Sequence, residues 1–275
     1  MPTGSSTTPS SAARSANDSK ALTTLARVGY VASGLVHLLV GWIAIKVAMG
    51  SSGKNADQSG AFQEIASTPG GVAALWAAVV GFVALAVWQV TEAIAGGRSA
   101  DPKDRTMDRV KAISKAVLYG FLAWTAFRYA SGGSTSGGGS KQESLTADLM
   151  GSTAGRVAIG VVGLVIVGVG VFHVVKGWRK KFLEDLRGTG GRHVGTAVVR
   201  LGQVGYIAKG IALGVLGGLF VAAAVTADPE KAGGLDDALR TIGEQPFGQF
   251  LLIATGVGIA AYGVYSFARA RFARM

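Results

Sequence analysis

Long segments without a charged side chain constrain this chain most. A helix rises about 1.5 Å per residue, so roughly 20 apolar residues cross a hydrocarbon core about 30 Å thick. Charged residues make up only 16% of the chain, whereas a typical soluble domain carries about a quarter. The composition therefore predicts an all-α integral membrane protein. The charge-free segments are residues 28–45, 65–91, 157–175, 210–227 and 245–268.

A sixth apolar segment, residues 116–127, is shorter and is bounded by Lys115 and Arg128. Long basic side chains can reach from a helix end to the lipid headgroups, so a short segment between two of them can still cross the membrane. We interpret it as a sixth membrane span. A buried or re-entrant segment is the alternative.

The apolar segments form three similar pairs. The sequence VGYVASG at residues 28–34 recurs as VGYIAKG at residues 204–210, and a Pro-x-Gly corner precedes the second segment at residues 69–71 and 246–248. The middle pair has diverged most. Two spans return the chain to the same side of the membrane, so the copies are parallel repeats. We therefore expect six transmembrane helices as three parallel two-helix repeats around a pseudo-threefold axis.

These features divide the chain into segments. The first residues are rich in Ser, Thr and Ala and lack the apolar core of a signal peptide. Short amphipathic helices are expected at residues 61–66 and 235–242, before the corners. The expected segments are a disordered cytosolic tail (1–24), repeat 1 (25–96), a cytosolic linker (97–112), repeat 2 (113–178), a basic cytosolic linker (179–199), repeat 3 (200–268) and a basic C-terminal tail (269–275).

The basic residues alternate between the two sides of the spans. Most lie in the N-terminal arm, the second and fourth connections and the C-terminal tail, and the other connections hold only Lys54, Lys141, Lys231 and Arg240. Basic residues in short loops stay in the cytoplasm, so we expect both termini there. The cytosolic face is then suited to anionic lipid headgroups. Topology alone explains this basic surface, and we expect no nucleic-acid partner.

Polar side chains inside the spans are the default candidates for function. His37 either binds a ligand or forms a hydrogen bond to a neighbouring helix. Three tyrosines recur near one level of the first helix of each repeat, and they either line a common axial cavity or anchor the interface. Two lysines at equivalent repeat positions reach either a ligand or the headgroups, and a nearby glutamate could pair with them. The candidate ligand-binding residues are His37, Tyr30, Tyr206, Tyr119, Glu92, Lys115 and Lys209.

Several chemistries have no support in the sequence. The absence of cysteine excludes disulfides, thiolate metal sites and cysteine nucleophiles. No phosphate-binding loop, His-Glu-x-x-His motif or nucleophile elbow occurs. His37 and His173 could hold a haem between facing helices, but their depths differ by roughly 10 Å at about 1.5 Å per residue. We therefore expect that the protein is not an enzyme and that it binds no metal and no cofactor.

Glycine is abundant inside the spans. Gly210, Gly214 and Gly218 recur at every fourth residue and form a continuous small face. Small residues let helix backbones approach closely in lipid, where packing drives helix association. We interpret this face as a packing surface, and a flexible gate is the alternative.

Residues 27–34, their copy at 205–210 and the Pro-x-Gly corners resemble the bacterial membrane family catalogued as domain of unknown function 1206. The resemblance covers roughly residues 25–267. It implies three two-helix units in a bacterial inner (plasma) membrane, and it brings no activity or site residue. The small-residue helices without catalytic groups favour a non-enzymatic scaffold, with a membrane-protein partner, or a protein that binds lipid or another hydrophobic ligand. The alternative is a small transporter or channel along the pseudo-threefold axis.

Overall fold

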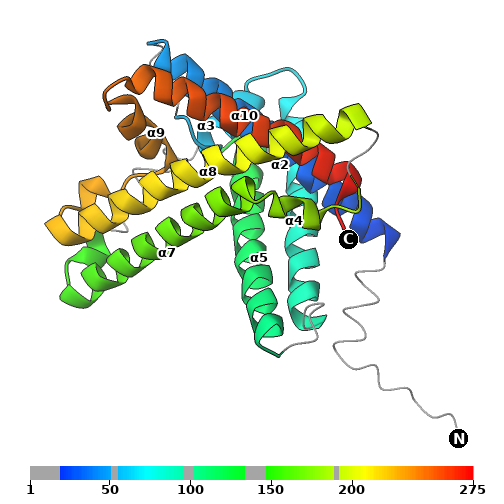
Figure 1. Cartoon of the computed structure of the whole chain (residues 1–275), viewed down its shortest axis with the longest axis horizontal. Coiled ribbons are helices and arrows are strands. Elements are labelled where there is room, and N and C mark those ends of the chain that lie inside the picture. The colour runs from blue at the N-terminus through cyan, green and yellow to red at the C-terminus, as the bar shows by residue number, and fades with distance from the viewer. Residues whose placement is uncertain (1–18, 51–54, 96–101, 134–146, 189–191, 275) are drawn as a thin grey trace, which may run out of the picture. The chain divides into compact units, whose positions relative to one another are not determined.

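The computed structural model describes residues 19–50, 55–95, 102–133, 147–188 and 192–274, which are mostly helical and contain no β-strand (Figure 1). This confirms the all-α class. The elements in chain order are α2 (Lys20–Ala48), α3 (Gln58–Ala66), α4 (Gly71–Ala95), α5 (Pro102–Ala130), α7 (Thr153–Trp178), the 3-10 helix η1 (Lys181–Asp185), α8 (Arg192–Thr226), the 3-10 helix η2 (Pro229–Lys231), α9 (Leu235–Gly243) and α10 (Gly248–Phe272).

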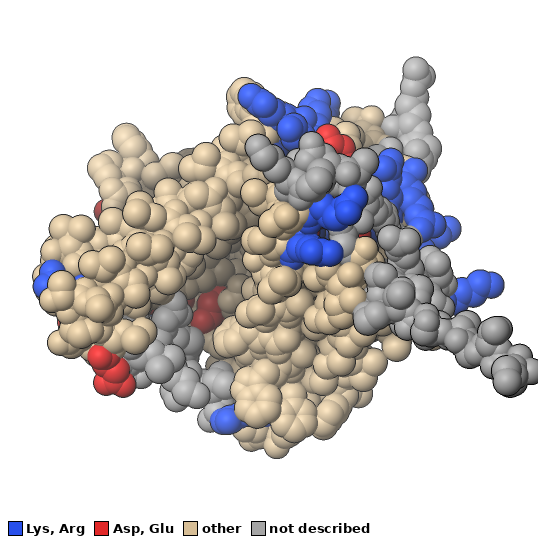
Figure 2. All heavy atoms as spheres, turned by 90° about the horizontal axis from the view of Figure 1, so that it is seen from below, with Lys and Arg blue, Asp and Glu red and all other residues tan. Residues whose placement is uncertain are grey.

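Five of the described helices are long and apolar enough to cross a membrane, namely α2, α4, α7, α8 over Gly195–Thr226, and α10. Most of the surface visible in Figure 2 carries no charged side chain, as expected of a surface that faces lipid. The helices thus indicate a multi-pass membrane protein. The segment 116–127 lies within α5, whose first part is rich in charged residues, and α5 is not one of the five. The sixth span therefore stays a prediction.

The helices run past the apolar segments. α2 begins at Lys20, inside the segment expected as a tail, and α5 and α8 begin at Pro102 and Arg192, inside the expected linkers. Lys, Arg, Ala and Leu favour helix whether or not they are buried in lipid, and proline is tolerated in a first turn. The helices therefore begin about one to three turns before the expected starts of the repeats. Residues 1–18 of the expected tail lie outside the described residues.

The chain divides into two compact units, and α2 contributes to both. The first unit holds α2 up to Ala32, α4 and α5, with α4 and α5 side by side. A methyl group added at Gly81 would lie 2.7 Å from the Cα atom of Gly29, so α2 and α4 touch through their backbones. The rings of Phe82 and Tyr119 stack with centroids 6.4 Å apart. Packing of α4 against α2 and α5 thus accounts for this unit.

The second unit contains the rest of α2, α3 and all described elements from α7 to α10. Glycine pairs bring two pairs of helices into backbone contact. On α7 and α8, an added methyl group at Gly163 would lie 2.8 Å from the carbonyl oxygen of Gly217, and one at Gly170 would lie 2.7 Å from that of Gly210. α7 and α8 accordingly run side by side in Figure 1. The pairs are seven residues apart on both helices, which is about two helical turns.

The second helix pair repeats this arrangement. An added methyl group at Gly34 would lie 2.9 Å from the carbonyl oxygen of Gly263, and one at Gly256 would lie 2.9 Å from that of Gly41. Positions 34 and 210 differ by 176, as do 41 and 217, which is also the offset between the two VGY sequences. The same repeat positions of α2 and α8 therefore pack against different neighbouring helices, α10 and α7.

The expected small face of α8 is correct at Gly210 but not at the next two glycines. A methyl group added at Gly214 or Gly218 would meet no atom within 4 Å, whereas one at Gly217 would lie 2.6 Å from Gly163. The sequence shows small residues at every fourth position. The contact instead follows the seven-residue spacing at which two packed helices meet again.

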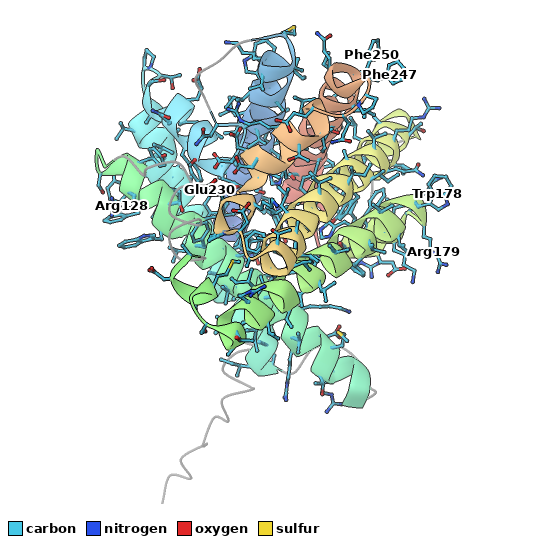
Figure 3. All side chains as sticks on the ribbon, turned by 90° about the vertical axis from the view of Figure 1, so that its left-hand side faces the viewer. Arg128, Trp178, Arg179, Glu230, Phe247 and Phe250 are labelled. Carbon is cyan, nitrogen blue, oxygen red and sulfur yellow. The ribbon has the colours of Figure 1, made fainter. Side chains whose placement is uncertain are left out.

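The corners before α4 and α10 share an unusual backbone. Both helices begin at the glycine of the Pro-x-Gly sequence, and the residue before it is left-handed, with φ of 77° at Gly70 and 61° at Phe247. A bulky side chain rarely adopts this conformation, which costs on the order of 1–3 kcal/mol. The Phe247 ring is 86% exposed (Figure 3), so contacts within the chain do not offset the strain.

We expect Gly217→Ala to loosen the packing of α7 on α8, because overpacking a close contact costs about 1–3 kcal/mol. The adjacent substitution Gly218→Ala is the matched control, since its methyl group has open space. Thermal unfolding in a mild detergent should show a lower midpoint for Gly217→Ala alone. Equal midpoints for both variants would contradict this packing register.

We expect Phe247→Gly to raise stability by about 1 kcal/mol, because glycine adopts a left-handed backbone without a steric penalty. The reciprocal variant Gly70→Ala should lower stability by a similar amount, since its methyl group meets no atom within 4 Å and only the backbone is strained. Unfolding midpoints of both variants, compared with the unsubstituted protein, check the pair. A destabilised Phe247→Gly variant would show that the ring makes a stabilising contact.

Candidate functional site

Lys209 places a basic group at the midpoint of α8, directly before the charge-free segment 210–227. It lies 17 residues from Arg192 and 17 from Thr226, the two ends of α8. A charged group in an apolar spanning helix is costly in a bilayer and is therefore a functional candidate. Its Nζ atom lies 3.1 Å from Nε2 of His37 on α2. Two of the residues expected from the sequence are thus in direct contact, although 172 positions separate them.

The hydrogen bonds of His37 fix its tautomer. Its Nδ1 atom lies 2.7 Å from the carbonyl oxygen of Ser33, one turn earlier on α2. A carbonyl oxygen only accepts, so Nδ1 carries the hydrogen and donates it. Nε2 is then the acceptor of the neutral ring, and Lys209 donates to it. Both readings of His37 are compatible with this arrangement, because it bonds to a neighbouring helix and also faces a candidate site.

A tyrosine from a third helix completes the contact. The Tyr262 ring of α10 lies 4.8 Å from the His37 ring, centroid to centroid, and 4.4 Å from Nζ of Lys209. An ammonium group within about 6 Å of an aromatic face is attracted by the ring quadrupole. Lys209 is therefore held by an imidazole nitrogen on one side and an aromatic face on another.

Aromatic rings continue from this point toward the end of α7. Tyr262 packs edge to face on Tyr206 at 5.2 Å, and Tyr206 stacks on Phe182 at 5.3 Å and on His173 at 5.7 Å. Phe182 belongs to η1 and is fully buried. The segment expected to be a basic cytosolic linker therefore places an aromatic side chain in the core of the second unit.

The same linker is tied to the C-terminus of α10. Leu186 and Ala273 form an antiparallel bridge, and Arg187 N donates to the carbonyl oxygen of Phe272 at 2.7 Å. Lys176 of α7 donates to Asp185 at 2.7 Å. These contacts close the end of the aromatic cluster with backbone and side-chain bonds.

A cavity of about 50 Å³ lies on the other side of Lys209. Lys209, His37 and Gln58 supply its polar lining. On the same measure a cavity needs about 10–15 Å³ to hold one water molecule, so this cavity suits a ligand of only a few non-hydrogen atoms. The apolar lining consists of Val36, Val40, Ala212, Leu213, Leu235 and Ile259.

Equivalent repeat positions face each other across this cavity. His37 and Leu213 differ by 176 positions, as do Val36 and Ala212, and Gln58 and Leu235 are the first residues of α3 and α9. The cavity therefore lies between matching surfaces of repeats 1 and 3. The two repeats differ in polarity there, because His37 and Gln58 replace leucines.

One buried carboxylate joins the two short helices beside the cavity. Asp236 in the first turn of α9 accepts from Ala56 N at 2.6 Å and from Nε of Arg240 at 2.8 Å. The hydrogen bond to Asp236 raises the pKa of the Arg240 guanidinium, so this ion pair stays charged. Asp57 caps α3 by accepting from Gly60 N at 2.9 Å. α3 and α9 are thereby fixed where Gln58 and Leu235 meet the cavity.

The structure brings together three of the seven candidate residues. His37, Lys209 and Tyr206 lie in the second unit, although Tyr206 contacts the aromatic cluster rather than the cavity. The other four, Tyr30, Glu92, Lys115 and Tyr119, belong to the first unit, where Lys115 is exposed on α5 and both tyrosines are buried.

Sequence reasoning missed several residues of the site. Tyr262, Tyr265 and Ser266 share one face of α10 and form a polar and aromatic stripe in an apolar segment, which was the available indication. Nothing in the sequence indicated Phe182 or Asp236. The rings of Tyr262 and Tyr206 lie between His37 and His173 and contact both. In the part of the chain that the structure describes, no group of three metal-ligating residues occurs.

We expect Asp236→Ala to loosen α3 and α9, because it leaves the buried N–H of Ala56 without its acceptor, at a cost of about 1–3 kcal/mol. Asp228→Ala is the control, since its ion pair with Lys231 is largely exposed and such pairs contribute about 1 kcal/mol or less. Hydrogen exchange should accelerate in α3 and α9 of the Asp236 variant alone. Unchanged protection of both helices would rule out this link.

Comparison with known proteins supports the repeat pattern. The family model described as Domain of Unknown Function (DUF1206) matches three times, at residues 28–96, 110–180 and 204–273. The chain is also similar to the Bacillus subtilis (strain 168) protein named "Uncharacterized protein YxxB", with 27% identity over 251 residues that cover 90% of each chain. No solved structure matches the chain.

Proposed function

The chain belongs to the family described as Domain of Unknown Function (DUF1206), and we propose that it is a non-enzymatic membrane protein that binds a small hydrophobic ligand in the cavity of its second unit. The observation that carries the proposal is the position of Lys209. A basic side chain at the midpoint of α8 lines a cavity whose other walls are mainly apolar. Charged side chains are rare in apolar spanning helices and mark functional sites there.

The proposal includes an architecture of six membrane spans in three parallel two-helix repeats. The threefold match of the family model supports it. So do the helix contacts, since the second helix of each repeat packs on the first helix of another: α4 on α5, α7 on α8, and α10 on α2. We place both termini in the cytoplasm of a bacterial inner membrane, with the basic residues of the cytosolic face against anionic headgroups. A membrane-protein partner would use the lipid-facing surfaces.

A small transporter or channel is the second candidate. It is supported by the row of side chains that leads from Lys176 through Tyr206 and Tyr262 to Lys209, where the cavity begins. The rings in this row are tightly packed, and the cavity is small. Both features favour a binding site over an open path, and flux of a ligand across liposomes would favour transport.

Native mass spectrometry of the protein in lipid nanodiscs tests the binding function. We expect a bound species of defined mass that is lost in Ala212→Leu, because the larger side chain fills the cavity. Ala158→Leu, the same change at an exposed position of α7, should retain the species. A ligand-free protein in all three samples would contradict the proposal, and a species retained by Ala212→Leu would place the ligand elsewhere.

A further inference from the structure

We infer that the small ligand of this cavity combines an apolar part with one negatively charged group, and that the ammonium group of Lys209 binds this group while His37 positions the lysine. The inference rests on the proposed binding function and names the chemical class of the ligand. A short carboxylate fits that class. Four features of the second unit support it. They are the charge balance at Lys209, the hydrogen bonds of Lys209, the existing partners of the nearby carboxylates and the size of the cavity.

The charge of Lys209 has no carboxylate counterpart among the described residues of the second unit. Among the residues that the structure describes, no carboxylate oxygen lies within 4.0 Å of its Nζ atom. Its two close partners, the neutral His37 ring and the Tyr262 face, bring no negative charge. Lys209 is part-buried, and leaving a charge that is shielded from water uncompensated is unfavourable. A bound anion would supply the missing charge.

The lysine also has hydrogen-bonding capacity to spare. An ammonium group has three N–H donors, and one is directed to Nε2 of His37. That bond holds Nζ at the wall of the cavity, because the opposite nitrogen of His37 is itself fixed by Ser33. The remaining donors can reach a ligand oxygen. Charge-assisted hydrogen bonds of this kind are shorter and roughly twice as strong as neutral ones.

The carboxylates nearest in sequence to the cavity residues already have hydrogen-bond or ion-pair partners. Asp57, next to Gln58, accepts from Ser59 Oγ at 2.6 Å and from Gly60 N at 2.9 Å. Asp236, next to Leu235, accepts from Ala56 N and pairs with Arg240. Neither carboxylate lines the cavity. The polar lining thus favours an anion and offers no acidic group to a cation.

The size of the cavity further limits which anionic ligands can bind. A volume of about 50 Å³ has room for roughly three to five water molecules at about 10–15 Å³ each, which suits a ligand of a few non-hydrogen atoms. Val40, Ala212 and Ile259 provide apolar walls, which suit the methyl group of a short carboxylate. A fatty acid offers the same carboxylate, and its chain would have to extend out of the cavity into the bilayer.

The experiment compares acetate with acetamide, a neutral molecule of nearly the same shape, on the full chain in nanodiscs of a neutral phospholipid. Binding is measured by ligand-observed NMR and by the shift of the thermal unfolding midpoint. We expect acetate to bind at least about tenfold more tightly than acetamide, because the difference is a charge-assisted bond to Lys209. Lys209→Met should abolish the preference, and Lys209→Arg should retain it. Lys46→Met, which removes a charge from an exposed position of α2, should leave acetate binding unchanged.

Each other outcome has a defined meaning. Equal binding of acetate and acetamide would overturn the inference while leaving a neutral ligand for the cavity, and acetate binding that survives Ala212→Leu would overturn it by placing the anion elsewhere. If acetate fails but laurate stabilises the protein in a Lys209-dependent way, the anion is supported and its source is a fatty acid. If neither stabilises it, the inference fails, and the mass-spectrometry experiment then decides separately whether any ligand binds. Circular dichroism of Lys209→Met and Lys209→Arg confirms that loss of binding is not loss of fold.

Discussion

Backbone contact between helices at paired glycines is the interaction on which the second unit depends. In lipid, apolar surface gains little by leaving its surroundings, so close packing has to hold the helices together. Lys209 and its two close partners, His37 and Tyr262, each lie beside such a contact. Lys209 precedes Gly210, Tyr262 precedes Gly263, and His37 lies one turn after Gly34. The same contacts that join the helices therefore fix the positions of the polar side chains.

A lysine within an apolar spanning helix is informative because membrane proteins seldom retain one without a use. Snorkelling lowers the cost when the ammonium group can reach the headgroups. At Lys209 the group is instead held on the wall of a cavity by His37 and Tyr262, in the middle of α8. The described part of the second unit thus stabilises the ammonium group without neutralising it. A site that favours anions follows from this balance of partners.

Much of the fold could be predicted from local sequence. Apolar length gave the spanning helices, and the corners gave the starts of α4 and α10 at Gly71 and Gly248. His37 and Lys209 were recognisable because polar residues are rare in such segments. Their contact was not predictable, since it joins positions 172 residues apart. Phe182 shows the same limit: its burial depends on Tyr206 and Tyr265, which lie on other helices.

The divergence between repeats explains why the site has one lysine and one histidine. Lys209 of repeat 3 corresponds to Ser33 of repeat 1, and His37 of repeat 1 corresponds to Leu213 of repeat 3, with an offset of 176 in both cases. Ser33 is not among the residues that line the cavity, so repeat 3 alone supplies its lysine. The neutral histidine of repeat 1 accepts a hydrogen bond from that lysine. The unequal repeats therefore produce one positive charge with a fixed position, which is what recognition of a single small anion requires.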